Sequence, residues 1–298
     1  MLDDQANELR LFDPMGVYVR TVGREGRGPG EFARPVRVDV SPAGDIWVMD
    51  PSNGRLSVFD SAGVYREAHQ AASGFVTYPW QGGFDLSGYY YTHLFRAGLG
   101  RFDASFNAID TLAFPTDPVE REAFQIVVDG VPRVMAGVPF QGGLAYRWAR
   151  SGSMWALLTD EYRLVQFAAD GDTVRSITTD YSPLPVSSEE RSEARENLEW
   201  FTRQGGQIDL SLIPDYKPAA TWFFVDDEGN AWVSRTQEAD GPQRFDVFNP
   251  VGQFMGVLRM PFELQASPIP VVSDGVLYGV SSDDLGVDYV VRAWVLRP

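Results

Sequence analysis

The sequence contains no cysteine and only two histidines in 298 residues. Without cysteine, disulfides, zinc–thiolate sites and thiol nucleophiles are excluded. No apolar run approaches the ~18 residues that a membrane-spanning helix needs. The first residues, Leu2 to Gln5, are acidic and polar, unlike the start of a signal peptide. The lack of cysteine assigns no compartment, because cytosolic and exported chains can both lack it.

Basic residues are also scarce: the sequence has 25 Lys and Arg and 41 Asp and Glu, which gives a formal net charge of −16. Nucleic acids and anionic membrane surfaces are poor partners for such a chain, because both bind clustered basic side chains. We therefore expect no nucleic-acid partner. The lack of a long apolar run predicts no membrane-spanning segment. We also expect the chain to be a monomer. The hydrophobic share of 44% is enough for a sizeable core.

What the sequence does contain is a long internal repeat. Residues 2–18 (LDDQANELRLFDPMGVY) align without a gap on residues 49–65 (MDPSNGRLSVFDSAGVY), 47 residues further on. The Phe-Asp pair of these segments returns at 102–103, and weaker copies follow at Phe167 and Phe248. Upstream of each lies a Gly turn followed by an aromatic residue. Such a period is typical of propellers and other repeat architectures.

The repeating unit reads as four short strands in about 40–50 residues, which is the content of one β-propeller blade. The run Ile46–Met49 is apolar on both faces, as expected for a strand covered by two neighbouring blades. We therefore predict an all-β chain, a single six-bladed β-propeller over residues 1–298, rather than a β-sandwich. Innermost strands are expected near 36–40, 80–86, 141–147, 221–226 and 269–273.

A glycine-rich stretch, GREGRGPGEF at 23–32, raises the question of a phosphate-binding loop. Such a loop must open a helix whose N-terminus faces the phosphates. Here Pro29 and Pro35 bracket the end of the stretch, a β-like run follows at 36–40, and no Gly-Lys-Ser/Thr occurs in it. We predict that the stretch is a connector between blades.

Two segments, 112–140 and 181–218, interrupt the repeat. The second contains a predicted helix that begins at Ser187 with a capping box to Glu190 and ends at Gly205. Both segments replace the connection from an outer strand to the next inner strand, so we expect both on one face, around the mouth of the central channel. They either carry a binding surface or only close the channel.

Four segments together resemble the bacterial NHL-repeat-like six-bladed propellers: VGREGRGPGEF, GDIWVMDPSNGRLSVFDSAG, VDDEGNAWV and DGVLYGVSSDDLGVDYVVRAWVL. The resemblance spans nearly the whole chain and implies its fold. It implies little about activity, because members are mostly exported or lipid-anchored proteins of unassigned function. NHL-type propellers elsewhere serve mainly as binding platforms, with a few lyases and hydrolases among them.

In such proteins two strands precede the counterpart of residues 2–13. We therefore expect that upstream residues, with a signal peptide, are missing here. The protein would then be periplasmic, lipid-anchored or secreted. The alternative is that the N-terminal strands complete the last blade as a closing clasp.

The residue types for acid–base or metal chemistry are sparse. His69 is expected at a solvated outer edge, and His93, in YYYTHLFR, is a weak candidate for a ligand or a base. Asp39, Asp85 and Asp226 lie on or near inner strands and could bind Ca²⁺ in the channel. The propeller lactonases bind calcium with Glu, Asn and Asp from different blades, but no matching set occurs here. Turn-capping roles for these aspartates are therefore favoured.

The sequence favours a binding or scaffold propeller that recognises a protein, peptide or glycan on the face carrying the insertions. No catalytic residue is assigned, since no Gly-x-Ser-x-Gly elbow occurs. No cofactor is expected, although calcium remains open. The alternative is a calcium-dependent, lactonase-like hydrolase or lyase with its site in the central channel. The expected binding residues are Trp80, His93, Phe140, Trp200 and Trp222.

Overall fold

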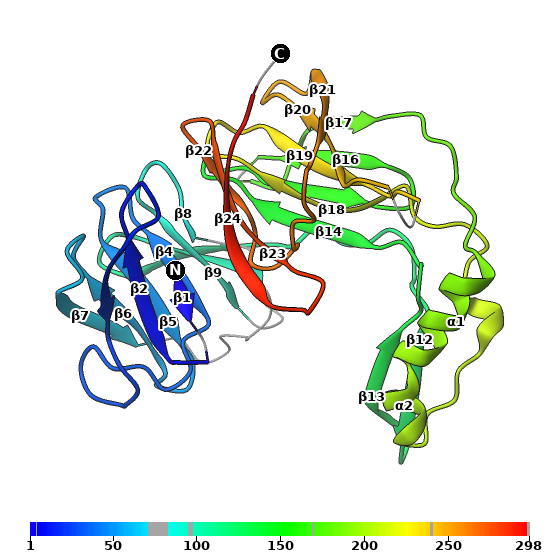
Figure 1. Cartoon of the computed structure of the whole chain (residues 1–298), viewed down its shortest axis with the longest axis horizontal. Coiled ribbons are helices and arrows are strands. Elements are labelled where there is room, and N and C mark those ends of the chain that lie inside the picture. The colour runs from blue at the N-terminus through cyan, green and yellow to red at the C-terminus, as the bar shows by residue number, and fades with distance from the viewer. Residues whose placement is uncertain (4, 71–82, 95–97, 169, 239–240, 297–298) are drawn as a thin grey trace. The chain divides into compact units, whose positions relative to one another are not determined.

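The computed structural model of the chain describes residues 1–3, 5–70, 83–94, 98–168, 170–238 and 241–296 (Figure 1). The fold is the predicted six-bladed β-propeller: six antiparallel sheets follow one another, and their strands pair in chain order. The chain divides into two compact units. Unit 1 is Met1–Phe114 with Trp148–Ser153 and Ala169–Gly171, and unit 2 is Pro115–Arg147, Met154–Ala168 and Asp172–Pro298.

Unit 1 holds the first three sheets. Their strands are β1 (Leu2–Asp3), β2 (Glu8–Phe12) and β3 (Tyr18–Val22); β4 (Arg37–Val40), β5 (Ile46–Asp50), β6 (Arg55–Phe59) and β7 (Tyr65–Gln70); and β8 (Gly83–Phe84), β9 (Tyr90–Leu94), β10 (Gly98–Phe102) and β11 (Ala108–Leu112). The expected inner strands near 36–40 and 80–86 correspond to β4 and β8.

Unit 2 holds the other three sheets, apart from the last residue of β14. Their strands are β14 (Leu144–Trp148), β15 (Met154–Leu158), β16 (Arg163–Phe167) and β17 (Thr173–Thr178); β18 (Ala220–Val225), β19 (Ala231–Arg235), β20 (Arg244–Phe248) and β21 (Phe254–Arg259); and β22 (Val271–Ser273), β23 (Val276–Ser282) and β24 (Asp288–Trp294). The three remaining inner-strand predictions are confirmed by β14, β18 and β22.

The second strand of each complete blade supplies much of the core. Every residue of β5 and of β15 is buried, so these strands are covered on both faces, as their apolar sequence predicts. Trp155 and Trp232 on second strands are almost fully buried. The outer strands β17 and β21 instead alternate between exposed and part-buried residues, which is the pattern of a strand with one solvent face.

The repeated Phe-Asp pair marks a β-bulge. The pairing register between third and outer strands shifts at five phenylalanines, Phe12, Phe59, Phe102, Phe167 and Phe248. A bulge lets the outer strand bend away while pairing continues. The sequence repeat is therefore the trace of one local backbone geometry used five times.

The polar residue that follows the phenylalanine closes the turn. Asp13 accepts hydrogen bonds from the main-chain N–H groups of Met15 and Val17, both at 2.9 Å. Asn249 accepts in the same way from Val251 at 3.1 Å and from Gln253 at 2.9 Å. Asparagine and aspartate stabilise turns by this geometry. The recurrence of these residues is thus structural, as the repeat predicts.

The glycine-rich stretch is a connector, as predicted. No helix begins within it, and its Phe32 is fully buried. The Glu31 carboxylate accepts hydrogen bonds from the Gly28 amide at 2.8 Å and from the Arg24 guanidinium at 2.7 Å. The Gly28 amide, which a phosphate would use, already has an anionic acceptor within the loop.

The two insertions pack together as one small layer, which we call the insertion module. It consists of a hairpin, β12 (Ala123–Val128) and β13 (Val131–Gly137), with α1 (Ser188–Asn197), α2 (Glu199–Arg203) and the 3-10 turn Leu210–Leu212. Figure 1 shows the hairpin beside the helices. The buried residues between them are Phe124, Ala136, Val138, Leu198, Phe201 and Ile213. Whether the module covers the channel mouth stays a prediction.

The predicted helix is present but divided. Its capping box is confirmed, because Ser187 Oγ accepts from the Glu190 amide at 3.1 Å and Glu190 accepts from the Ser187 amide at 2.9 Å. Leu198 leaves the helical conformation and separates α1 from α2. No helix among the described residues is long and apolar enough to cross a membrane.

His69 corrects one expectation. We expected a solvated histidine, but its side chain is only 17% exposed. Its ring stacks on Trp47 and on Phe106, with centroid separations of 5.1 Å to each. The sequence suggested an edge position because His69 lies on an outer strand, but Trp47 of the same sheet and Phe106 of the turn between β10 and β11 cover its ring.

Buried tyrosines should make the protein sensitive to alkaline pH. Burial, followed by the hydrogen bond that Tyr162 donates to Asp246 (2.5 Å), raises the pKa of the Tyr162 phenol. Burial and Asp85 raise the pKa of Tyr91 in the same way. The raised folded-state pKa means that the stabilisation is complete below the unfolded pKa of about 10 and is lost as pH rises above it.

We therefore expect the free energy of unfolding to fall above pH about 10. In Tyr162→Phe, this slope should become shallower, by up to about 1.4 kcal/mol per pH unit. Urea titrations of both proteins between pH 8 and pH 11.5 measure the slopes. Identical slopes would mean that Tyr162 ionises as readily in the folded chain as in the unfolded one.

Candidate functional site

A cavity of about 960 Å³ lies in unit 2. Two predicted binding residues, Phe140 and Trp222, line it together. Trp222 is part-buried on β18, where its ring contacts Phe224 and Phe245. Phe140 follows β13 and has a left-handed backbone with φ of 59°. The cavity therefore joins the insertion module to the propeller blades.

Blades and insertions of unit 2 together form the walls of the cavity. The start of β14, the strand β18, the end of β19 and the loop at 263–266 provide the blade side, while Phe140, Glu190 and Lys217 come from the insertions. Most polar side chains on the walls are uncharged. These are Gln141, Thr159, Thr221, Ser234, Thr236, Gln237, Gln243, Gln265 and Ser282.

An ion pair crosses the cavity wall. Lys217 Nζ donates to the Glu190 carboxylate, and both side chains are largely buried. Burial raises the pKa of Glu190, but Lys217 and the Ser187 amide outweigh it and lower the pKa below its usual value. Because Glu190 also caps α1, this residue links the helix to the cavity. Lys217 Nζ also donates to the carbonyl of Gln237 at 3.4 Å. Gln237 lies in the connection between β19 and β20.

A second charged group on the wall, Arg235, is also paired. Its Nε donates to Asp246 Oδ2 at 2.6 Å, and that carboxylate accepts the Tyr162 phenol as well. Burial lowers the pKa of Arg235, but the hydrogen bond to Asp246 outweighs it and raises the pKa overall. The guanidinium therefore stays charged and has its partner within the blade.

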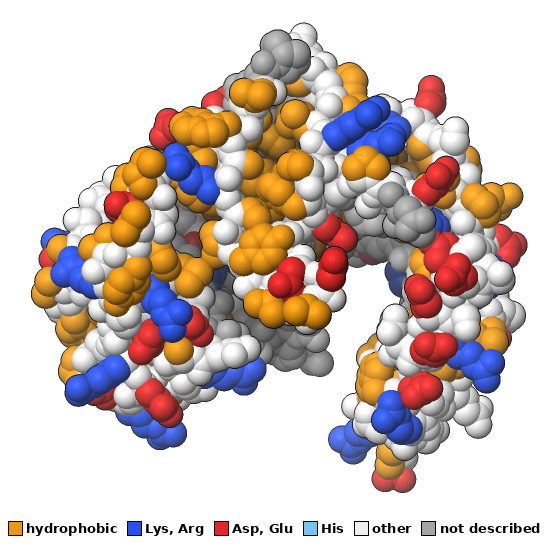
Figure 2. Space-filling model, in the orientation of Figure 1, with side chains coloured by type: hydrophobic (Ala, Val, Ile, Leu, Met, Phe, Trp, Pro, Cys, Tyr) orange, Lys and Arg blue, Asp and Glu red, His pale blue; other side chains and the backbone are white. Residues whose placement is uncertain are grey.

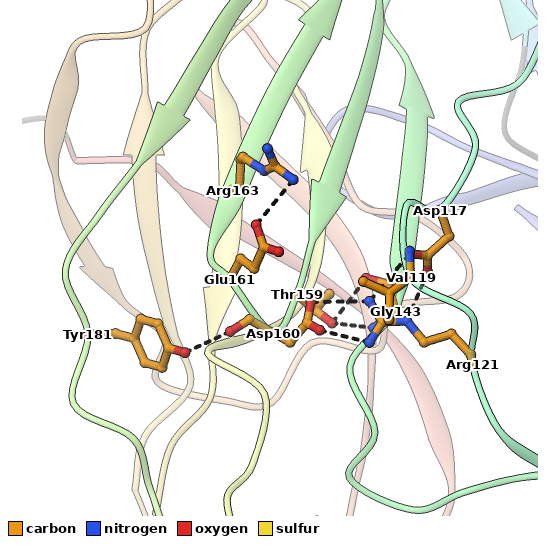
Figure 3. A network of polar contacts seen from close by, with 9 residues as sticks. All are labelled: Asp117, Val119, Arg121, Gly143, Thr159, Asp160, Glu161, Arg163 and Tyr181. Carbon is orange, nitrogen blue, oxygen red and sulfur yellow. Dashed lines mark hydrogen bonds and ion pairs between the residues drawn. The ribbon is translucent and has the colours of Figure 1, made fainter.

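A polar network anchors both insertions to the turn between β15 and β16 (Figure 3). Arg121 of the first insertion donates to Asp160 at 2.7 Å and to Asp117 at 3.0 Å. Tyr181 of the second insertion donates its hydroxyl to the carbonyl of Asp160 at 2.7 Å. One residue of the blade thus holds both insertions, which explains how they reach the same cavity.

Two of the other predicted binding residues, His93 and Trp200, do not line this cavity. Trp80 lies outside the described residues. His93 belongs to unit 1, where its ring lies 4.7 Å from that of Phe114 and burial lowers its pKa. Trp200 lies on α2 and is 44% exposed. Figure 2 shows acidic and basic side chains interspersed over the part of the molecule that holds the helices.

The three aspartates considered for calcium all have other partners. Asp39 accepts from Arg37 at 2.7 Å. Asp85 accepts from the amides of its own turn and from Tyr91, and Asp226 accepts from its turn and from Trp232. No group of three His, Asp or Glu side chains in the described part of the chain could hold a metal. These residues do not fit a calcium site as arranged, and the calcium prediction itself stays untested.

The sequence did not predict three features of the cavity: Lys217, the position of Glu190 in its wall, and the amide side chains that line it. Glu190 was identified only as a helix cap, and nothing in the spacing of the sequence brings it next to Lys217 or Gln237. The interruptions of the repeat at 112–140 and 181–218 were the only signal in the sequence that pointed to Lys217 and Glu190.

Comparison with known proteins supports the fold and goes no further. No protein-family model matches the sequence, and no curated protein is significantly similar to it. A member of the DUF4221 family from Bacteroides vulgatus is 10% identical, with 96% of this chain and 86% of that one covered and a TM-score of 0.51. A Bacteroides fragilis protein whose name proposes export is 12% identical, with coverages of 94% and 75% and a TM-score of 0.50.

Virginiamycin B lyase from Staphylococcus aureus is a more distant match, at 8% identity, coverages of 97% and 78%, and a TM-score of 0.43. At these identities the similarity to the two Bacteroides structures shows the propeller fold alone. Assignment to the NHL repeats stays a prediction, since no family model supports it.

Proposed function

We propose that this chain is a binding protein that holds its ligand in the cavity of unit 2. One observation carries the proposal: side chains from both insertions line the same cavity, together with blade residues that include Trp222. A rigid β-scaffold with insertions around a pocket is a common arrangement for binding sites. The family resemblance of the sequence supports an exported location for this protein.

The charged groups of the cavity favour binding over catalysis. Lys217 and Arg235 each have an acidic partner, and those carboxylates also accept from the Ser187 amide and the Tyr162 phenol. General acid–base catalysis needs a proton donor or acceptor that can reach the substrate. The ion pairs of Lys217 and Arg235 instead form part of the cavity wall, and each pair carries no net charge.

Blocking the cavity should remove binding without harming the fold. Ala266 lines the cavity and is exposed, so Ala266→Arg places a long side chain inside it with little strain. Labelled wild-type protein is first screened against peptide and glycan arrays, and the hits are then measured by calorimetry. We expect Ala266→Arg to weaken these hits at least tenfold with an unchanged melting temperature.

The matched control is Ala104→Arg, which adds the same side chain at an exposed alanine in unit 1. It should bind as the wild type does. Hits that Ala266→Arg leaves intact would place binding elsewhere and contradict the proposal. An absence of any hit on either array would contradict it as well.

A further inference from the structure

We propose that the ligand of this cavity is a neutral, linear oligosaccharide. This inference rests on the proposed function, because it names the class of ligand that the same cavity would bind. Four features of the cavity carry it: two buried polar atoms without a partner, paired wall charges, two aromatic rings and a second adjoining cavity.

The two polar atoms are adjacent in the chain. Thr236 Oγ1 and Gln237 Oε1 are excluded from solvent, and neither has a hydrogen-bond partner among the described residues. Both residues line the cavity and are only part-buried. An unpaired buried polar group is costly and needs a physical explanation. A ligand that supplies hydrogen bonds there provides one.

The chemistry of these atoms favours hydroxyl groups as partners. Gln237 Oε1 can only accept a hydrogen bond, whereas Thr236 Oγ1 can donate or accept. A hydroxyl group can donate to the first and bond to the second in either sense. Neighbouring hydroxyls on a sugar ring therefore match two adjacent side chains of this kind without requiring one fixed order of donors and acceptors.

The wall charges favour a neutral ligand. Lys217 already pairs with Glu190, and Arg235 with Asp246. A charged ligand would have to compete with these internal partners. An acidic ligand would in addition meet Glu263 in the cavity wall and the overall charge of −16. A neutral polyhydroxylated ligand meets neither obstacle.

The two aromatic side chains suit a sugar ring, whose faces carry C–H groups that pack on aromatic rings. Trp222 and Phe140 both line the cavity, one from a blade and one from an insertion. The uncharged amides and hydroxyls listed above line the same cavity. A small number of such polar groups in a part-apolar pocket is what fixes a ligand in orientation.

The adjoining cavity points to a chain of several sugars. A second cavity of about 250 Å³ runs along α1, where Glu193 and Asn197 are among its lining residues. It shares Phe140 and Glu190 with the larger cavity. A linear ligand that extends along Phe140 and Glu190 would contact both cavities, and both would then contribute to its binding.

The test uses maltohexaose, cellohexaose, mannohexaose and the hexamer of N-acetylglucosamine, each titrated calorimetrically into the full chain. At least one should bind, and Ala266→Arg should abolish it. Thr236→Val and Gln237→Leu should each weaken it about tenfold, the loss expected for one buried hydrogen bond. Because its hydroxyl is buried and unpaired in the free protein, Thr236→Val should not lower the melting temperature.

Thr159→Val is the matched control for stability. Its hydroxyl also lines the cavity but already bonds to Gly143, accepting at 2.8 Å and donating at 3.2 Å. This variant should lower the melting temperature by a few degrees.

The outcomes separate this inference from the proposed function. If a peptide from the array binds in a way that Ala266→Arg blocks, and no hexasaccharide binds, the binding function stands and the oligosaccharide is wrong. If neither peptide nor hexasaccharide binds, both proposals fall. If a hexasaccharide binds equally well to Thr236→Val and Gln237→Leu, the assigned contacts are overturned.

Discussion

Replacing Asp226 by alanine is expected to lower the free energy of unfolding by about 4 kcal/mol, because it leaves several buried donors unpaired. The Asp226 side chain is 2% exposed. Its Oδ1 accepts from the amides of Glu228 at 3.0 Å and Asn230 at 2.7 Å. Its Oδ2 accepts from Asn230 Nδ2 at 2.8 Å and from Trp232 Nε1 at 3.0 Å.

The position of Trp232 makes the loss large. This indole is 2% exposed and packs with Phe224 and Phe245 in the hydrophobic core of unit 2. Without Asp226 its N–H has no acceptor among the described residues, and water cannot reach it without opening the core. The turn would therefore lose its own hydrogen bonds and also strain the aromatic cluster behind it.

Urea unfolding measures the effect, and Asp283→Ala is its matched control. Asp283 closes an equivalent turn, accepting from the amides of Leu285 and Val287 at 2.9 Å, but it is exposed. Its loss should cost about 1 kcal/mol, because water can replace the carboxylate. Equal losses in the two variants would show that burial of the Asp226 network adds nothing.

Phe201→Ala is expected to unfold the insertion module while the blades stay folded. Phe201 is fully buried in the cluster between the hairpin and the helices, with its ring 6.4 Å from that of Phe124. Removing a buried phenylalanine costs about 3–5 kcal/mol. The cluster that contains Phe201 is separate from that of the blades around Phe224, so the loss should remain local.

Hydrogen exchange followed by mass spectrometry distinguishes the two parts. We expect rapid exchange in β12, β13, α1 and α2, with protection retained in β19. Ligand binding should also be lost, since the module provides Phe140 and Glu190 to the cavity. The neighbouring variant Trp200→Ala should exchange as the wild type does, because that side chain is 44% exposed. A uniform loss of protection in Phe201→Ala would mean that the module and the blades unfold together.

Local patterns in the sequence were enough to predict the fold. The Phe-Asp pair, the polar turn and the doubly apolar strand each depend on interactions within a few residues, so each leaves a readable trace. The helix and its capping box were predicted for the same reason, and both are present. Trp200 shows the limit of residue type alone, since it was chosen for its ring and lies at the surface.

The candidate site could be predicted only in part. Phe140 and Trp222 were expected to bind because they are aromatic residues near interruptions of the repeat, and the structure brings them to one cavity. Glu190, Lys217 and Gln237 come from different parts of the chain, and only the packing of the insertion on the blade makes them neighbours. No periodicity records a contact of that kind.

The sequence by itself therefore determined the blade, its number of repeats, its bulge and its turns, because each is a short-range property repeated along the chain. The tertiary structure decided which side chains line the cavity together, that Lys217 and Arg235 in its wall are paired, and that Thr236 and Gln237 hold unpaired oxygens beside it. These depend on how two insertions of unrelated sequence pack on one turn at Asp160, an arrangement that long-range contacts alone select.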